Sequence, residues 1–280
     1  MKHETTKHYS QEAALFEGFL DPYMKYSSGW FADWDEPLDA AVLRMLDKIL
    51  DTSGIRDGSR ILEIGNGWGS LLKRLRERFA DVDYTGVNPS RVQLAWIAAH
   101  VDTSATAINA PFEEVMDALD GPFDAVFMVG ALCHMKDKQA VMDRVAALLA
   151  PDGRLVVEDT FFLSEALYQA HAARSETKYV QDTIFGYAHV HSLARHHDEL
   201  RNAGLQVLRA ETNSDHYARS IEIWTDRLKT MDPDRWPLAA HFIAYMDVFQ
   251  RGWNYTICNQ LQTVGRLPER RRPKVALPTS

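Results

Sequence analysis

A short apolar segment that ends in three alternating glycines limits the fold of this chain more than any other feature. Ile61–Ile64 encloses a single acid, Glu63, and a helical pattern at Leu71–Leu75 follows soon after. The glycines between them are Gly65, Gly67 and Gly69. A strand, a tight glycine turn and a helix in this order form the entrance of a nucleotide-binding βαβ unit. The spacing is not that of the dinucleotide fingerprint G-x-G-x-x-G, and no Lys-Ser/Thr pair of a phosphate loop follows. We therefore predict a cofactor loop of another kind, with a purely structural turn as the alternative.

The composition argues against several classes of protein. Of the 280 residues, 46% are hydrophobic and 25% are charged, as in ordinary globular proteins. The net charge is −8 and the basic residues cluster only at Arg266–Lys274, so we expect no nucleic-acid partner. No apolar run reaches the ~18 residues of a membrane span, and the first residues are polar, so we expect no transmembrane segment and no secretory signal. Cys133 and Cys258 lie far apart and are expected to be reduced thiols of a cytoplasmic protein.

Strand and helix patterns alternate between residues 60 and 160. The predicted strands are Arg60–Ile64, Val82–Val87, Thr106–Asn109, Ala125–Val129 and Arg154–Glu158, and the predicted helices are Leu71–Phe79, Arg91–His100, Phe112–Leu119 and Lys138–Leu149. Pro151–Gly153 is predicted to be a turn before the fifth strand. Such alternation indicates an α/β fold, a parallel sheet with helices on both faces, in which ligands bind at the carboxyl ends of the strands.

The pattern changes after Glu158. Phe161–Val190 is rich in aromatic residues and is expected to form a helical lid. The remaining predicted elements are a helix at Ser192–Ala203, a strand at Gly204–Ala210, helices at Ala218–Lys229 and Arg235–Gln250, and a strand at Asn254–Gln262. The expected organisation is an N-terminal helical segment over the cofactor at 1–55, a Rossmann-like core at 56–160, lid helices and the last strands at 161–262, and a basic, proline-containing tail at 263–280.

In the order of its motifs, the chain resembles the cyclopropane fatty acid synthase-like family of class I methyltransferases, which depend on S-adenosyl-L-methionine (SAM). The resemblance covers about Tyr23–Gln262. Besides the glycine loop, the matching segments are Tyr26–Phe31, Gly86–Ser90 with Gln93, Phe112–Glu113, Val129–His134, and His216–Arg219 followed by Trp224. The resemblance implies a Rossmann-like class I methyltransferase fold with a mostly parallel seven-stranded sheet, N-terminal helices and a helical lid. It also implies SAM as the cofactor.

The resemblance implies a departure at the family's anion site. Members that build cyclopropane rings hold bicarbonate through Cys, Glu, His and Tyr side chains. By position these become Ser28, Cys133, Glu158 and Tyr217 here, so only the tyrosine is kept. A carboxylate at Glu158 would also repel a nearby anion. We therefore expect neither bicarbonate as a cofactor nor an unactivated alkene as the acceptor.

The resemblance also implies where the cofactor binds. The expected cofactor-binding residues are Tyr26, Ser27, Glu63, Gly65, Gly67, Trp68, Gly69, Asn88, Gln93, Phe112 and Glu113. Glu63 is expected to orient the ammonium group of SAM, directly or through the loop, with a helix-capping or surface acid as the alternative. Phe112 and Glu113 are expected to hold the adenine, with a core role for Phe112 as the alternative. Asn88 offers an amide to the ribose hydroxyls, but Asn88-Pro-Ser is equally good turn chemistry, so both roles stay open.

Three side chains are candidates for the chemistry: His134, Glu158 and Tyr217. His134 can orient the substrate or act as a base near neutral pH, with a buried structural histidine as the alternative. Glu158 is a candidate base or ammonium anchor. Because a buried carboxylate needs a partner, the alternative for Glu158 is a salt bridge with a lid residue.

No metal is expected. His189, His191, His196 and His197 are close in sequence, but we find no cysteine or acidic ligand at a zinc-binding spacing. His196 and His197 fall on a helix that is predicted to lie at the surface.

The favoured function is a SAM-dependent methyltransferase that methylates a small-molecule acceptor at C, N or S, in specialised metabolism, with a homodimer left open. The methyl donor is already activated, so catalysis consists mostly of positioning the acceptor. The alternative is a SAM-dependent enzyme that transfers no methyl group, such as a cyclase that converts SAM into azetidine-2-carboxylate and methylthioadenosine. A SAM-binding module without catalysis is the third hypothesis, and it leaves His134, Glu158 and Tyr217 without a role.

Overall fold

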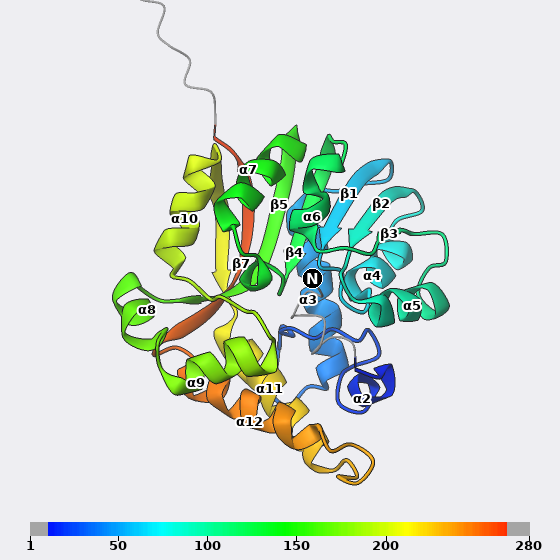
Figure 1. Cartoon of the computed structure of the whole chain (residues 1–280). Helices are drawn as coiled ribbons and strands as arrows, with labels where there is room; N and C mark the ends of the chain where they lie inside the picture. Colours follow the sequence, from blue (N-terminus) through cyan, green and yellow to red (C-terminus); the bar gives the residue numbers. More distant parts are fainter. Residues whose placement is uncertain (1–10, 268–280) are drawn as a thin grey trace, which may run out of the picture.

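The computed structural model describes residues 11–267, which form a seven-stranded sheet with helices on both faces (Figure 1). The strands are β1 Ser59–Ile64, β2 Val82–Val87, β3 Thr106–Ile108, β4 Phe123–Val129, β5 Leu149–Phe162, β6 Leu205–Thr212 and β7 Ile257–Arg266. Their order across the sheet is β3-β2-β1-β4-β5-β7-β6. Only β7 is antiparallel to its two neighbours. This arrangement confirms the predicted, mostly parallel sheet.

Helices connect these strands and extend beyond the sheet. They are α2 Ala13–Glu17, α3 Leu38–Ser53, α4 Ser70–Arg78, α5 Arg91–His100, α6 Phe112–Val115, α7 Lys138–Leu148, α8 Glu165–His171, α9 Ser175–Lys178, α10 Leu193–Asn202, α11 Ser214–Lys229 and α12 Ala239–Gly252, with the short turns η1 Met116–Ala118, η2 Leu132–His134 and η3 Tyr179–Ile184. The segment after β5 is helical, as predicted. However, α11 begins four residues before its predicted start, and α12 begins four residues after its own predicted start. Within residues 11–267, no helix has the length and apolar character that crossing a bilayer requires.

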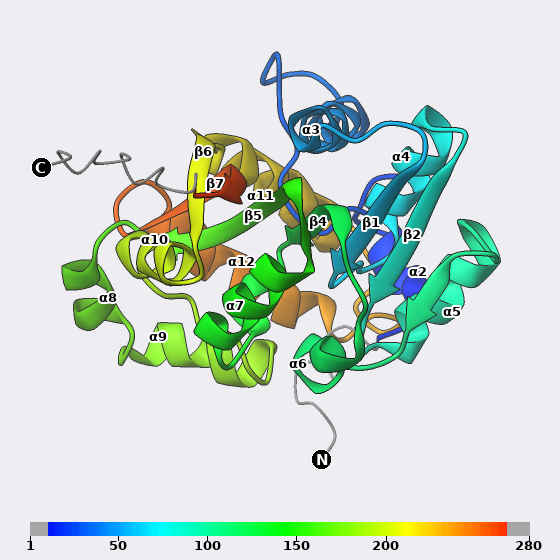
Figure 2. The ribbon, with the colours of Figure 1, turned by 90° about the horizontal axis from the view of Figure 1, so that it is seen from above.

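Alternate residues of the central strands contribute to two separate cores. Ile61 of β1 and Phe127 of β4 belong to the core that includes the buried faces of α3 and α4. Their neighbours Leu62 and Val126 belong to the core that includes α7 and α10. Successive side chains of a strand point to opposite faces, so a sheet covered on both sides requires near-continuous apolar strands. Figure 2 shows α3 and α4 on one side of the strands and α7 and α10 on the other.

The predicted turn at Pro151–Gly153 lies inside β5 rather than before it. Phe123 pairs with Leu149 and Ala125 pairs with Arg154, so the ladder skips four residues of β5. A Cβ on Gly153 would lie 2.9 Å from the carbonyl oxygen of Phe123, which explains the glycine at this crossing. The expected boundaries at 160 and 262 also fall within strands, because β5 continues to Phe162 and β7 to Arg266. The rest of the expected tail, 268–280, lies outside the described residues.

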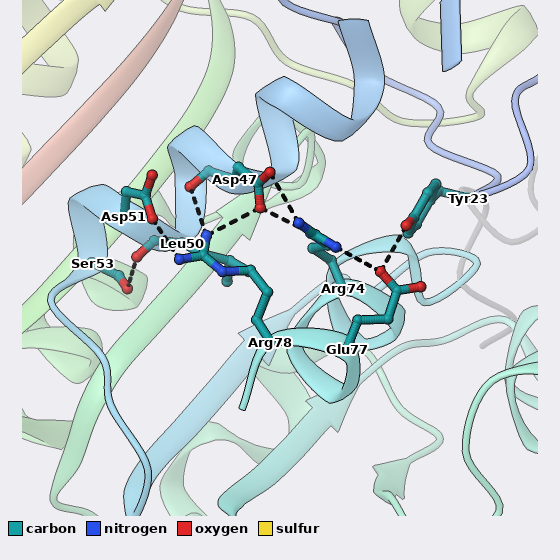
Figure 3. Close-up of polar contacts among 8 residues, drawn as sticks. All are labelled: Tyr23, Asp47, Leu50, Asp51, Ser53, Arg74, Glu77 and Arg78. Atoms are coloured by element: carbon teal, nitrogen blue, oxygen red, sulfur yellow. Dashed lines mark hydrogen bonds and ion pairs between the residues drawn. The ribbon is translucent and has the colours of Figure 1, made fainter. Parts of the chain in front are cut away.

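Ion pairs attach the N-terminal segment to α4 (Figure 3). Asp47 of α3 accepts from Arg74 at 2.8 Å and from Arg78 at 3.1 Å. Glu77 accepts from Arg74 at 2.9 Å and from the Tyr23 hydroxyl at 2.7 Å. Each such pair contributes little when it is partly exposed. The network therefore orients α3 and Tyr23 on α4, while apolar burial supplies most of the stability.

A second set of contacts holds the segment before α3 against α11. The amide of Gly29 donates to the Ser220 hydroxyl at 3.0 Å, and the amide of Phe31 donates to Nδ1 of His216 at 3.1 Å. Trp30 stacks on His216 with ring centroids 4.5 Å apart. Two sequence motifs that lie far apart in the chain thus form one packed unit.

Candidate active site

The glycine loop after β1 has the backbone conformation that its sequence requires. Gly65, Gly67 and Gly69 have φ angles of +77°, +48° and +78°, which L side chains rarely adopt. A Cβ on Gly65 would lie 2.7 Å from that of Ala131, and a Cβ on Gly69 would lie 2.9 Å from Ile97 Cγ1. A Cβ on Gly67 would meet no protein atom within 4 Å. Gly69 therefore serves the packing of α4 against α5, whereas Gly67 leaves space open for a ligand.

One cavity at the carboxyl ends of β1, β2 and β4 collects all the predicted cofactor residues except Gly69. We call it the cofactor cavity; its lining includes Tyr26, Ser27, Glu63, Gly65, Gly67, Trp68, Asn88, Gln93, Phe112, Glu113 and His134. The carboxyl ends of parallel strands are where open α/β sheets bind ligands. The position of the cavity therefore agrees with the expected cofactor site.

Glu63 is a buried acid in this cavity, so the surface alternative is wrong. Its exposed fraction is 3%, and the Tyr84 hydroxyl donates to its carboxylate at 2.6 Å. Burial raises the pKa of Glu63 to about 7, although the hydrogen bond from Tyr84 lowers it. No cationic side chain of residues 11–267 forms an ion pair with Glu63. A cationic ligand group in the cavity would supply the missing charge.

Asn88 forms the turn that the sequence offered as one of its two roles. Its Oδ1 accepts from the amide of Ser90 at 2.8 Å, which is the expected turn. Its Nδ2 donates to the carbonyl of Gly67 at 3.1 Å and to Oε1 of Gln93 at 3.0 Å. The side chain thus ties the end of β2 to the glycine loop and also lines the cavity.

Phe112 and Glu113 lie at the start of α6, beside the same cavity. Phe112 is 2% exposed and packs in the core, so the alternative role, that of a core residue, is confirmed. Oε1 of Glu113 accepts from the amides of Lys136 and Asp137 at 2.9 and 2.8 Å. Glu113 therefore holds the loop after η2 in place. Their contacts with adenine remain predictions.

A second cavity adjoins the first and contains the three candidate catalytic residues. We call it the acceptor cavity; its lining includes Cys133, His134, Glu158, Tyr217, Tyr245 and Asn259. The residues that line both cavities are Tyr26, Ser27, Gly130 and His134. They form the boundary at which a donor in one cavity would meet an acceptor in the other.

Glu158 is neutralised by a cation that was not predicted. Its Oε2 lies 3.0 Å from Nζ of Lys25, and both side chains are 1% exposed or less. The Ser27 hydroxyl donates to the same oxygen at 3.0 Å, and the Asn213 amide donates to Oε1 at 3.3 Å. The alternative role offered for Glu158 was a salt bridge with a lid residue; the salt bridge is present, but its partner comes from the N-terminal segment. The predicted repulsion between Glu158 and an anion is therefore weaker than the sequence suggested.

Lys25 has its donors fully engaged. A lysine ammonium offers three hydrogens. Besides Glu158, it donates to the Ser28 carbonyl at 2.8 Å and to the Ser27 hydroxyl. The ammonium group thus stabilises the wall of the cavity and has no further hydrogen for an added anion.

His134 is held in one tautomer by its surroundings. Its Nδ1 lies 3.0 Å from the carbonyl oxygen of Tyr187, and a carbonyl only accepts. Nδ1 of the neutral ring therefore carries the hydrogen, and Nε2 has the lone pair. Asp159 positions the same turn by accepting from the amides of Leu132 and Cys133 at 2.8 and 3.3 Å. Burial raises the pKa of Asp159 to about 6.

Tyr217 reaches the acceptor cavity from the first turn of α11. Its ring packs against Trp224 and Trp253, with centroids 6.0 and 5.1 Å away. Asn213, just before α11, accepts through its carbonyl from the Tyr217 amide at 2.9 Å. The position of Tyr217 is thus set by the residue that also contacts Glu158.

Sequence reasoning missed Lys25, Asp159 and Asn213. A buried acid requires a compensating partner, so a lysine directly before the Tyr26-Ser27 motif was an available signal for Lys25. Asp159 directly follows Glu158 in β5. Because successive residues of a strand point to opposite faces of the sheet, Asp159 was not expected to take part in the same site. For Asn213, the sequence carries no signal that we can identify.

The histidine-rich segment departs from the prediction. His196 is fully buried and stacks on Phe161 at a centroid distance of 4.8 Å, and His191 is 1% exposed. Burial lowers the pKa of His196 to about 3. Glu199 lies one turn after His196, and its carboxylate and the two rings present ligand atoms within 4.8 Å of one another. The two arguments against a metal, a surface position for His196 and the lack of a suitably placed acid, are therefore wrong.

Comparison with known proteins shows the family to which the chain belongs. A model of the mycolic acid cyclopropane synthetase family matches residues 1–257. Cyclopropane mycolic acid synthase MmaA2 of Mycobacterium tuberculosis is 26% identical over 272 residues, which cover 92% of this chain and 91% of that protein.

Solved structures share the fold. Mycolic acid cyclopropane synthase CmaA1, complexed with SAH and CTAB, has a TM-score of 0.81 at 22% identity, covering 93% of this chain and 96% of that one. Coclaurine N-methyltransferase, bound to N-methylheliamine and SAH, has a TM-score of 0.77 at 18% identity, covering 94% and 81%. These likenesses confirm the class I methyltransferase fold. Because the family match spans most of its length, this chain belongs to the mycolic acid cyclopropane synthetase family and is an enzyme with SAM as its cofactor.

Proposed function

We propose that this enzyme transfers a methyl group to C, N or S of a small polar molecule held in the acceptor cavity, in specialised metabolism. The observation that carries the proposal is the boundary shared by the two cavities, which Tyr26, Ser27, Gly130 and His134 line from both sides. SAM supplies an activated methyl group when it is bound. The residues of the chain then have to position the acceptor and exclude water.

The cofactor cavity fits SAM in two respects. The open space at Gly67 admits a ligand next to the backbone, and Glu63, which has no cationic partner among residues 11–267, suits the ammonium of the cofactor. We assign Glu63 to that ammonium, Phe112 and Glu113 to the adenine, and Asn88 with Gln93 to the ribose.

On the acceptor side, His134 and Tyr217 have the most direct roles. Nε2 of His134 can accept a hydrogen bond from an acceptor O–H, N–H or S–H group or take its proton. The hydroxyl of Tyr217 can orient an acceptor lone pair. Glu158 remains a candidate for the chemistry, and its contacts with Lys25, Ser27 and Asn213 favour a positioning role over that of a free base.

We also propose that bicarbonate is not a cofactor. One of the four side-chain types of the family's anion site is kept, Tyr217, and the Lys25 ammonium already has three acceptors. The mycolic acid synthases among the relatives make a lipid the competing acceptor. The buried ion pair in the cavity wall supports a polar acceptor instead. A cytoplasmic location and a homodimer stay proposals, to be tested by cell fractionation and light scattering.

The test is incubation with SAM, first alone and then with panels of small amines, thiols, activated-carbon acceptors and unsaturated fatty acids, with mass spectrometry of the nucleoside. We expect S-adenosylhomocysteine only when a polar acceptor is present, and equal rates in carbonate-free and bicarbonate-supplemented buffer. Methylthioadenosine from SAM alone would identify a cyclase instead. Turnover of fatty acids alone, or a rate that bicarbonate restores, would overturn the proposal.

A further inference from the structure

Beside α10, several buried polar atoms of residues 11–267 lack a well-formed hydrogen bond. They include Nε2 of His191, both ring nitrogens of His196 and Oε2 of Glu199. His191 Nε2 and Glu199 Oε2 lie 3.0 Å apart, so these two atoms are each other's partners. His196, which is fully buried, has one side-chain partner, Gln262, for its two ring nitrogens. Gln262 can satisfy one of these nitrogens, and leaving the other buried and unpaired destabilises the fold.

We propose that His191, His196 and Glu199 bind a zinc ion. Two imidazole nitrogens and one carboxylate oxygen form a donor set that zinc prefers, whereas calcium and magnesium prefer oxygen ligands alone. The ligand atoms of the three residues lie within 4.8 Å of one another. Tetrahedral bonds of about 2.0–2.2 Å would bring them to about 3.4 Å, so rotation of the side chains has to close the site.

A fourth ligand is available from the sheet. The amide oxygen of Gln262 on β7 is also buried, and the Gln262 side chain forms a polar contact with His196. Nε2 of Gln262 donates to Oε1 of Gln260 at 3.0 Å. The Gln262 oxygen is therefore the atom that faces His196 and could bind a metal. With Gln262, the donor set reaches the four ligands that structural zinc sites usually have.

The place of the site in the fold indicates a structural metal. None of His191, His196 and Glu199 lines the cofactor cavity or the acceptor cavity. His191 lies where the lid segment returns to the sheet, since its carbonyl accepts from the Phe162 amide at 3.0 Å. The preceding residue, Val190, lines the acceptor cavity. Zinc would thus fasten the end of the lid to α10 and stabilise one wall of the acceptor cavity.

The experiment uses the full-length protein, stripped with a chelator, reconstituted with ZnSO₄ and desalted. We expect about one zinc per chain by elemental analysis and a rise in Tm of about 5 °C with excess zinc. Glu199→Gln keeps the shape of the side chain and removes its charge, and His196→Gln removes a ring. Both should retain less than about a tenth of the zinc and show no zinc-dependent rise in Tm.

His197→Gln is the matched control, because His197 is the neighbour of His196 on α10 but is not part of the set. It should bind zinc like the unchanged protein. If His196→Gln does not fold, Glu199→Gln decides the question. Equal zinc retention in the unchanged protein and in Glu199→Gln, or none in the unchanged protein, would overturn the proposal.

Discussion

The two cavities of this enzyme meet at a common wall but are built in different ways. The cofactor cavity draws most of its lining from the ends of successive strands and the loops that follow them, from Glu63 to Met135, with a smaller part from the N-terminal segment. The acceptor cavity brings together Glu158 and Tyr217 from distant parts of the chain, and Glu158 pairs with Lys25, a residue of the N-terminal segment. Local spacing thus encodes the cofactor site, whereas tertiary packing encodes the acceptor site. The difference explains why the cofactor can be read from a sequence more readily than the substrate.

The largest effect is expected where the acceptor cavity depends on its buried ion pair. Lys25→Met leaves Glu158 buried and unpaired, which should lower the free energy of unfolding by about 3–5 kcal/mol in urea titrations. The double variant Lys25→Met with Glu158→Leu should recover most of that loss, because no charge then remains.

Lys229→Met is the matched control for this prediction. Lys229 pairs with Asp226 on the exposed face of α11, where such a pair contributes at most about 1 kcal/mol. Equal effects of Lys25→Met and Lys229→Met would show that the buried pair has no special part in the acceptor cavity.

The next prediction concerns the cofactor cavity alone. Gly67→Val should raise the Kd for SAM at least about 100-fold in calorimetry, since its side chain would occupy the open space at the loop. Gly54→Val is the control: Gly54 has a φ of +73° and also no protein atom within 4 Å of an added Cβ, but it lies outside the cavity. If both variants bind SAM equally, the loop does not contact the cofactor.

Turnover should separate the two cavities. Tyr217→Phe removes only a hydroxyl and is expected to lower kcat about 10- to 100-fold, while the Kd for SAM changes by less than about twofold. Glu158→Gln should also lower kcat and leave the Kd for SAM nearly unchanged, when kcat is calculated per folded protein. Tyr255→Phe, at a tyrosine that is 82% exposed, should turn over normally. Normal turnover of Tyr217→Phe and Glu158→Gln on the true acceptor would make both residues structural.

The smallest effect is a pH dependence of SAM binding. Glu63 has a pKa raised to about 7, so its carboxylate form predominates above pH 7 and is lost below it. If that carboxylate binds the ammonium of SAM, the Kd should rise about tenfold between pH 8 and pH 6. Glu63→Gln should bind more weakly at pH 8 and lose this dependence. A profile that is the same in both proteins would remove Glu63 from the cofactor site.

The sequence predicted the regular parts of the molecule well. The apolar strands, their alternation with helices and the glycine loop are local patterns; the structure confirms the sheet, and the family match confirms the family. The position of the Pro151–Gly153 turn was missed because nothing local shows that a strand continues on both sides of it. Lys25 was missed because its partner lies 133 residues away. His196 was assigned to the surface because histidine was counted as polar, although it shares the buried face of α10 with Leu200.

The hydrogen bond from Gly29 to Ser220 joins residues 191 positions apart. Closing so long a loop costs conformational entropy before any contact offsets it, and such contacts form late in folding. We therefore expect the strands and helices of the core to assemble first, and the segment around Tyr26 to dock onto them once α11 has formed. During synthesis, the wall between donor and acceptor therefore cannot form before α11 has been made, although its N-terminal half is among the first residues of the chain.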